Sequence, residues 1–181
     1  MPGNIEPSEL LQRAKDGDKE AFGELYRLYF TPIYRYLFIR LRSRERADDL
    51  AQDVFLKIFA KVETLREIPL APLSYFFTVA RNTLIDFWRK KKDLSLENEN
   101  ETAAKVPDGG ADLLENLARA EVAAKVRQGL AALPAEEAEI VALKYFGGLS
   151  AREIGQSLGL SEEAVRQRQC RALKKLRVIF K

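Results

Sequence analysis

The sequence contains no histidine and only one cysteine, Cys170, among its 181 residues. Without histidine it lacks the most common general base at neutral pH and the most common nitrogen ligand for metals. A single cysteine permits neither an internal disulfide nor a thiolate cluster. These absences argue against an enzyme, a metal site or a bound cofactor. They suit a reducing cytoplasm, where we expect the protein to be located.

Long apolar runs are absent as well. No segment approaches the roughly 20 apolar residues that span a bilayer. The first residues, MPGNIEPSELL, lack the basic stretch followed by an apolar one that directs export. We therefore expect no membrane insertion and no export. The apolar content of 46% is enough to bury one or two small cores.

Charge is unevenly distributed along the chain, although the net charge is only +3. Residues 1–92 hold 17 Lys and Arg against 13 Asp and Glu, residues 93–116 hold one against seven, and residues 117–181 hold 12 against seven. The two basic blocks predict contact with a polyanion at two separate places. The acidic block lacks a sustained apolar period and contains a Pro-Asp-Gly-Gly turn, so we interpret it as a flexible linker.

Apolar residues recur at helical spacing on both sides of this linker, and no alternating pattern indicates a strand. We therefore predict an all-α fold of two small helical domains, residues 1–92 and 117–181, which the linker allows to move independently. Pro32 marks a kink or a break in the first long helix. The predicted helices cover residues 21–42, 47–62, 71–92, 112–133, 134–148, 150–159 and 161–180.

The C-terminal segment carries the signals of a helix-turn-helix. Ser150 and Glu153 make a capping box, Gly159 ends a short helix, and Ser161 caps the next one. Gly155 stands four residues before Gly159, where a small residue allows two helices to cross closely. These local signals predict a motif that places its second helix on DNA.

A helical wheel of the last helix separates an apolar side from a basic one. From residue 166 to 181 there are seven cations and no acid. Most charge runs are solvated faces, but charges of one sign on the second helix of this motif favour DNA contact. Glu162 and Glu163 either complement the helix dipole or accept a hydrogen bond from a cytosine. The inward residues are Val165, Ala172 and Leu176, and the outward ones are Glu163, Arg166, Gln167, Arg171 and Lys174.

The predicted helix 47–62 has an outward face on which carboxylates border apolar side chains. This face fits either a docking strip for another protein or an ordinary solvated surface. Paired carboxylates also occur in glycoside and metal chemistry, but without histidine we do not favour that explanation. The wheel buries Leu50, Val54, Phe55, Ile58 and Val62, and it exposes Asp49, Gln52, Asp53, Leu56 and Ala60.

The predicted helix 71–92 ends in an aromatic pair followed by cations. For Trp88, at the margin of the wheel, packing at the edge of the core is favoured over stacking on a base. Lys90, Lys91 and Lys92 extend past the core, where they can reach phosphates. The wheel buries Phe77, Ala80, Leu84 and Phe87, and it exposes Arg81, Asn82, Ile85, Asp86 and Arg89.

The segments DDLAQDVFLKIF, YFFTVARNTLIDFWRKKK and LPAEEAEIVALKYFGGLSAREIGQSLGLSEEAVRQRQCRALKKLR occur in this order, the last beyond the linker. Together they resemble regions 2 and 4 of bacterial RNA polymerase sigma factors of the extracytoplasmic-function (ECF) subfamily, over roughly residues 20–92 and 128–178. The resemblance implies a non-catalytic protein that binds core RNA polymerase, recognises two promoter elements and helps to open the DNA. The usual regulator of such proteins is an anti-sigma factor.

The resemblance also implies roles for particular residues. Asp49, Gln52 and Asp53, with Leu56 and Ala60 beside them, would dock on the clamp coiled coil of the largest polymerase subunit. Region 4 would also meet the flap of the polymerase, and the linker would run near the RNA exit path. The loop of residues 63–73 would hold a base flipped from the non-template strand. Arg81, Asn82, Asp86 and Arg89 match the helix that meets the downstream element, and Arg166, Gln167, Arg168 and Arg171 match the helix that recognises the upstream element in duplex DNA.

Residues at the start of the last helix and residues farther along it are expected to make different contacts with DNA. Arg166 and Gln167 lie near the end that enters the major groove, whereas Lys174 and Lys175 lie two turns later and should meet phosphates. The sequence departs from the family pattern at Gln169, a position that is usually apolar, and at Leu173, a position that is often basic.

The rival hypothesis is a helix-turn-helix regulator whose N-terminal half binds a ligand or dimerises. It predicts tight duplex binding by the free protein.

Overall fold

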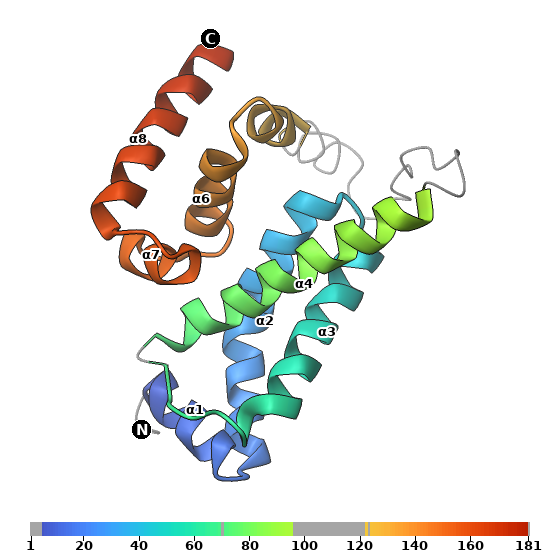
Figure 1. Cartoon of the computed structure of the whole chain (residues 1–181), viewed down its shortest axis with the longest axis vertical. Coiled ribbons are helices and arrows are strands. Elements are labelled where there is room, and N and C mark those ends of the chain that lie inside the picture. Colours follow the sequence, from blue (N-terminus) through green and yellow to red (C-terminus); the bar gives the residue numbers. More distant parts are fainter. Residues whose placement is uncertain (1–4, 70, 96–121, 123, 181) are drawn as a thin grey trace, which may run out of the picture.

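The computed structural model describes residues 5–69, 71–95, 122 and 124–180, and all regular structure within them is helical (Figure 1). The predicted all-α fold is therefore confirmed for these residues. Residues 124–131 are helical and precede α6. The other helices are α1 (Pro7–Lys15), α2 (Lys19–Leu41), α3 (Arg44–Val62), α4 (Pro72–Ser95), α6 (Ala135–Tyr145), α7 (Ala151–Leu158) and α8 (Glu162–Ile179).

Helices α1 to α4 form a bundle with an aromatic core. The rings of Phe55 and Phe76 are buried edge to face, with centroids 5.5 Å apart. The Asp18 side chain accepts hydrogen bonds from the first backbone N–H groups of α2, and Ser43 does the same for α3. Such caps satisfy groups that have no partner inside the helix. The two long helices therefore begin where the sequence supplies a cap.

Two features of the bundle differ from the sequence prediction. Helix α1 was not predicted from the sequence, although Pro7 in its first turn and the adjacent Leu10 and Leu11, both buried, are recognisable signals of a short amphipathic helix. The possible break at Pro32 is wrong, because α2 continues through it. Proline removes one helical hydrogen bond. Packing of α2 against its neighbours keeps the helix intact despite that loss.

The C-terminal helices form the predicted helix-turn-helix. Ser150 Oγ accepts from the Glu153 N–H at 3.2 Å, and Glu153 Oε2 accepts from the Ser150 N–H at 2.8 Å, which completes the capping box. Gly159 ends α7 with a left-handed φ of 68°. A Cβ atom on Gly155 would lie only 2.6 Å from the carbonyl oxygen of Leu160. The absence of a side chain at Gly155 is thus what allows the turn to close on α7.

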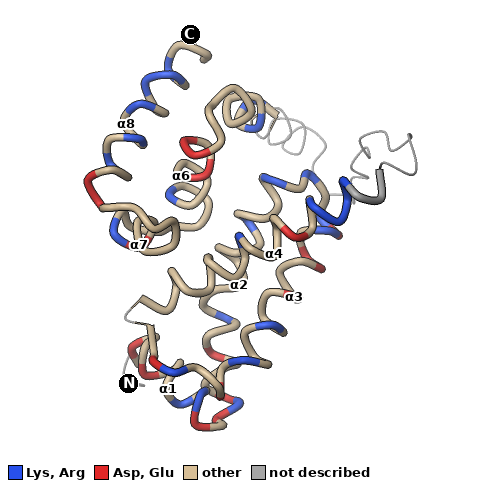
Figure 2. Tube along the Cα trace, viewed as in Figure 1, with Lys and Arg blue, Asp and Glu red and all other residues tan. Residues whose placement is uncertain are grey.

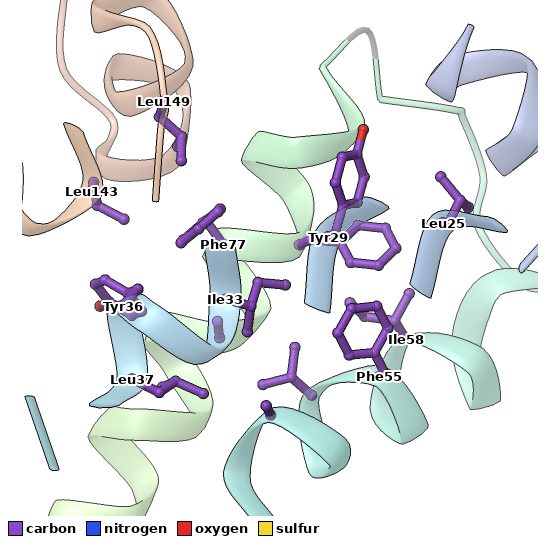
Figure 3. Packing of buried hydrophobic residues seen from close by; sticks show 14 of the residues in the cluster. Leu25, Tyr29, Ile33, Tyr36, Leu37, Phe55, Ile58, Phe77, Leu143 and Leu149 are labelled. Carbon is purple, nitrogen blue, oxygen red and sulfur yellow. The ribbon is translucent and has the colours of Figure 1, made fainter. Parts of the chain in front are cut away.

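The two halves of the chain pack against each other. Leu143 and Leu149 belong to the same buried cluster as the bundle residues Tyr36 and Phe77, and the four side chains lie close together in Figure 3. A Cβ atom on Gly147 would lie 2.7 Å from the Phe77 ring. The two halves therefore share apolar contacts in this arrangement, and their independent movement stays a prediction.

The predicted linker lies almost wholly outside the described residues. Its first three residues, 93–95, continue α4, and residues 96–116 are not described. The acidic linker and the domain boundaries therefore stay predictions. Among the helices of the described ranges, none combines the length and the apolar character that a membrane crossing requires.

Candidate nucleic-acid and polymerase interfaces

Basic residues recur along helix α8 (Figure 2), and most of them are exposed to solvent. The inward and outward sides that the helical wheel predicts are both confirmed. Val165 and Ala172 are buried in the core, and Leu176 is partly buried beside it. Within the helix-turn-helix motif this solvent-facing side is available for a groove of DNA. The exposed side chains are Glu163, Arg166, Gln167, Arg171 and Lys174.

The two glutamates at the start of α8 hold the side chains that follow them by one turn. Glu162 accepts a hydrogen bond from the Arg166 guanidinium. Glu163 Oε1 accepts one from Gln167 Nε2 at 3.1 Å. Pairs separated by four residues face each other on a helix and stabilise it modestly. The glutamates therefore orient the two side chains that we predict to enter the major groove.

Two other predicted DNA contacts on α8 point toward α6 instead. Arg168 Nε lies 3.3 Å from a carboxylate oxygen of Glu136, and its Nη1 atom is buried with no hydrogen-bond partner. Lys175 Nζ donates to both oxygens of the buried Glu137 carboxylate, each at 2.9 Å. The wheel could not find these partners, because it places a residue only relative to its own helix.

The two residues that depart from the family pattern both lie against the domain. Gln169 is partly buried, and its Nε2 atom lies 3.4 Å from the Tyr145 hydroxyl oxygen. Leu173 is also partly buried. A polar side chain at position 169 is therefore accommodated by a hydroxyl from α6, and an apolar one at position 173 contributes to burial.

Helix α4 carries a second polar face. Asn82 and Arg89 are exposed, and Arg89 Nη2 donates to Asp86 Oδ1 at 2.9 Å. Arg81 Nε lies 3.8 Å from Glu139 of α6, so this residue of the predicted DNA face is partly engaged by the other half of the chain. The run of residues 90–92 continues the face to the end of α4, where blue segments cluster in Figure 2.

Trp88 is 43% exposed. Its ring meets the Phe87 ring edge to face, with centroids 5.5 Å apart, and Phe87 packs on the core of the bundle. Tryptophan combines a large apolar area with a polar N–H, which suits partly open positions. Trp88 therefore packs on its neighbour as predicted, while a large part of its ring remains open to solvent beside the cations of α4.

The outward strip of α3 has the predicted exposure. Leu56 is 65% exposed, which is unusual for leucine, and the polar residues on either side of it are also exposed. Phe59, which was not predicted as part of this strip, is 42% exposed, and its ring packs edge to face on Phe22. Its position three residues after Leu56 was the available signal. The full predicted strip is Asp49, Gln52, Asp53, Leu56 and Ala60, all exposed.

A buried polar cluster joins the two halves, and no local sequence signal predicts it. The Tyr36 hydroxyl donates to Glu139 Oε1 at 2.6 Å, and Arg40 Nη2 lies 2.8 Å from Glu139 Oε2. Tyr36 is fully buried, and its burial, followed by the charge of Glu139, raises the pKa of its hydroxyl well above the usual 10.0. The tyrosine therefore remains a hydrogen-bond donor at physiological pH.

These surfaces have the chemistry of binding sites. Their cations and amides are donors for phosphate oxygens and base edges. Among the described residues, no three His, Cys, Asp or Glu side chains come together in a way that could hold a metal ion. What the arrangement offers is two basic helices in different halves of the chain and an acidic, apolar strip on a third helix.

Two family models match the chain. The model for Sigma-70 region 2 matches residues 25–93, and the model for Sigma-70, region 4 matches residues 129–178. The first covers α3 and most of α2 and α4, and the second covers α6, α7 and all but the last residue of α8. Together the matches include each helix on which we placed a binding surface, in the order expected from the sequence.

Curated relatives extend the match beyond these regions. The chain is 30% identical to the RNA polymerase sigma factor YlaC of Bacillus subtilis over 146 residues, which cover 79% of this chain and 82% of the relative. It is also 30% identical to the ECF RNA polymerase sigma factor BldN of Streptomyces coelicolor over 175 residues, which cover 93% of this chain. That alignment spans 63% of the length of BldN.

Solved structures share the fold. CnrH, solved with the cytosolic domain of CnrY, matches with a TM-score of 0.69 at 23% identity, over 96% of both chains. The sigma factor RpoE of Bartonella quintana, solved with the anti-sigma factor NepR, matches with a TM-score of 0.64 at 21% identity, over 88% of this chain and 96% of that one. The region models and the relatives indicate the same family. The chain therefore belongs to the ECF RNA polymerase sigma factors, non-catalytic subunits that direct transcription initiation.

Proposed function

We propose that this sigma factor recognises two promoter elements with two separate helices. α4, in the domain of residues 1–92, meets the downstream element, and α8, in the domain of residues 117–181, meets the upstream element in duplex DNA. The acidic segment 93–116 links the two domains. The observation that carries the proposal is the presence of an exposed polar and basic face on one helix in each half of the chain.

On α8 the proposal divides base recognition from phosphate contact. Arg166 and Gln167 lie at the start of the helix with their side chains already held in place, which supports contact with base edges. Arg171 and Lys174 lie farther along the same exposed face, which supports contact with phosphates. Arg168 and Lys175 also belong to the proposed DNA surface, and they must first exchange their partners on α6.

On α4 the proposed contacts extend from the middle of the helix to its end. Arg81, Asn82, Asp86 and Arg89 meet the downstream element, and the lysines of residues 90–92 follow its phosphates. The exposed part of Trp88 lies next to these cations. The segment of residues 63–73, whose last two residues begin α4, holds a base of the melted non-template strand, and this contact helps to keep the DNA open.

The strip on α3 is proposed to dock on the clamp coiled coil of the polymerase. Exposed Leu56 and Phe59 next to Asp49 and Asp53 resemble the anchors and charged rim of a protein interface. Asp53→Arg should weaken the complex with core polymerase, because it reverses a charge at a solvent-facing position. Equal retention of the variant and of the unaltered chain on immobilised core polymerase would contradict this docking site.

Region 4 is proposed to contact the flap of the polymerase, and the whole chain is proposed to have an anti-sigma partner. Two proteins of the same fold were solved with a bound partner: RpoE with the anti-sigma factor NepR, and CnrH with the cytosolic domain of CnrY. A regulator of this kind would compete for the surfaces that contact polymerase or DNA.

Transcription with purified components tests the proposal. Bacterial core polymerase with this chain should initiate from a specific promoter selected from a genomic or random DNA library, and core polymerase alone should not. The free chain should bind the same duplex only weakly. Tight binding by the free chain without stimulation of polymerase would instead support a self-standing regulator, and it would overturn the proposed mode of action.

A further inference from the structure

The turn between α2 and α3 is basic, and none of the surfaces assigned so far includes it. Between residues 35 and 46 the sequence has five arginines and one acid, Glu45. Arg42 and Arg44 are exposed on either side of Ser43, the cap of α3. Neither arginine has an ion-pair partner among the described residues. The turn therefore presents two cations whose charges are not used inside the described part of the fold.

Arg42 occupies a position where the backbone favours glycine. It ends α2 with a φ of 59° and a ψ of 19°, and no other non-glycine residue in the described ranges has a positive φ. This left-handed conformation is unfavourable for a residue with a Cβ atom, and glycine usually ends helices in this way. Glycine would make the same turn with less strain. The geometry of the turn therefore does not explain why arginine is present.

Arg44 also stands where local stability disfavours it. It is the first residue of α3. The N-terminus of a helix carries a partial positive charge, which favours Asp or Glu and disfavours a cation. Residues that oppose the local structure tend to mark functional positions. Two of them on one exposed turn indicate that these arginines serve a purpose other than folding.

The turn lies at the end of the bundle where the proposed DNA face of α4 also ends. α3 and α4 run in opposite directions (Figure 1), and Lys57 Nζ of α3 donates to Thr83 Oγ1 of α4 at 3.1 Å. α3 begins 13 residues before Lys57, and α4 ends 12 residues after Thr83. Both ends are therefore about 20 Å from this contact, toward the same end of the bundle. Figure 2 shows Lys and Arg gathered there.

We propose that Arg42 and Arg44 form a further phosphate-binding site, which contacts the backbone of the duplex next to the downstream promoter element. DNA that follows α4 past its exposed cations Arg89 and Lys90 reaches the turn next. An exposed turn contacts the backbone rather than base edges, because only an element inside a groove reaches the bases. This continuity with α4 favours DNA over an acidic protein surface. The inference rests on the proposed contact of α4 with the downstream element.

Substitutions at the turn can remove the charges without harming the fold. Arg42→Gly suits the left-handed backbone, and Arg44→Ala removes a cation from a helix N-terminus, so the double variant should be at least as stable as the unaltered chain. Arg27→Ala is the control, because it removes an exposed arginine of α2 about 20 Å from the turn. Thermal unfolding of the three chains checks these stabilities.

The binding of promoter DNA by the polymerase complex measures the site. The double variant should bind about tenfold more weakly, and the slope of log affinity against log salt should fall by about two units, since each phosphate neutralised contributes about 0.9. Arg27→Ala should leave both quantities unchanged. A scrambled downstream element should show the same loss for the double variant, because phosphate contacts carry no sequence information.

Neutral phosphates locate the contact. Duplexes are prepared with one methylphosphonate at a time on either side of the downstream element. At one or more positions the neutral linkage should weaken binding by the unaltered chain severalfold and have no effect on the double variant. Such non-additive losses show that the arginines and that phosphate interact directly.

Several results would overturn the site. The first is an affinity and a salt dependence of the double variant equal to those of the unaltered chain, and the second is an equal effect of every methylphosphonate on both chains. Weaker binding of the double variant to core polymerase without DNA would assign the arginines to a protein interface, and a lower melting temperature would assign them to folding. If the unaltered chain directs no promoter-specific transcription, the proposed function fails and this inference with it.

Discussion

The N-terminal bundle forms a core among its own helices, whereas the C-terminal helices share much of their core with the bundle. α2, α3 and α4 contain 23, 19 and 24 residues, long enough to bury an aromatic core among themselves. α6 and α7 contain 11 and eight residues, and several of their buried side chains belong to the cluster of the bundle. Short helices obtain most of their stability from tertiary packing. The C-terminal half therefore depends on a surface supplied by the bundle.

The largest effect should come from the shared core. Phe76→Ala removes a fully buried ring of the bundle and should lower the free energy of unfolding by about 3–5 kcal/mol. Because the two halves share apolar contacts, backbone hydrogen exchange should accelerate in α6 and α7 as well as in α4. Leu28→Ala, at a side chain that is 51% exposed, is the control and should have little effect. Faster exchange confined to α1 to α4 would show that the halves are independent.

A smaller effect should separate base recognition from phosphate contact. Arg166→Ala should cost about 1–3 kcal/mol at the preferred upstream element and much less at a scrambled one, because a lost bidentate contact matters only where its guanine is present. Lys174→Ala should weaken both DNAs alike and flatten the salt dependence of binding. Titration of both DNAs with the polymerase complex at several salt concentrations measures the affinity of each variant and its salt dependence. The reverse pattern would mean that α8 lies differently in the groove.

Helix caps allow a matched comparison of the two halves. Ser150→Ala breaks the capping box of α7, and Ser43→Ala removes the single cap of α3. Each should cost about 1 kcal/mol in chemical denaturation. The loss at Ser150 should be the larger, because Glu153 loses its hydroxyl partner as well. An equal or smaller loss at Ser150 would indicate that α7 is held by its contact with α4 rather than by its cap.

The smallest effect is confined to alkaline pH. Burial raises the pKa of Tyr29 to about 12, and Glu153 of α7 adds to the shift. Since the folded state holds this proton more tightly than the unfolded one, where the pKa is 10.0, the stability it contributes is complete below pH 10 and is lost between pH 10 and about 12. Tyr29→Phe should therefore flatten the fall in unfolding free energy over this range. Tyr145→Phe, at an exposed ring, is the control, and a fall as steep in Tyr29→Phe as in the unaltered chain would contradict the prediction.

The features that could be predicted from the sequence are local ones. The capping box at Ser150, the left-handed Gly159 and the buried faces of α3, α4 and α8 all follow from neighbours within a few turns. The hydrogen bond between Tyr36 and Glu139 joins residues 103 positions apart, and no sequence pattern near either residue predicts it. Likewise, the orientation of Arg168 and Lys175 toward α6 depends on which helix packs beside α8. Sequence periodicity therefore identified the faces, while the partners of several charged residues required the fold.

If Arg166 contacts a base as proposed, its pairing with Glu162 makes DNA binding an exchange of acceptors. In the free chain the guanidinium already has a carboxylate partner, so contact with a guanine replaces one hydrogen bond by another. Much of the rotamer freedom of the arginine has already been lost before binding, which reduces the entropic cost at a correct site. At an incorrect base, no new hydrogen bond replaces the one that Arg166 loses to Glu162. Under the proposed contact, the helix would thereby gain discrimination between sequences while its total affinity for DNA stayed modest.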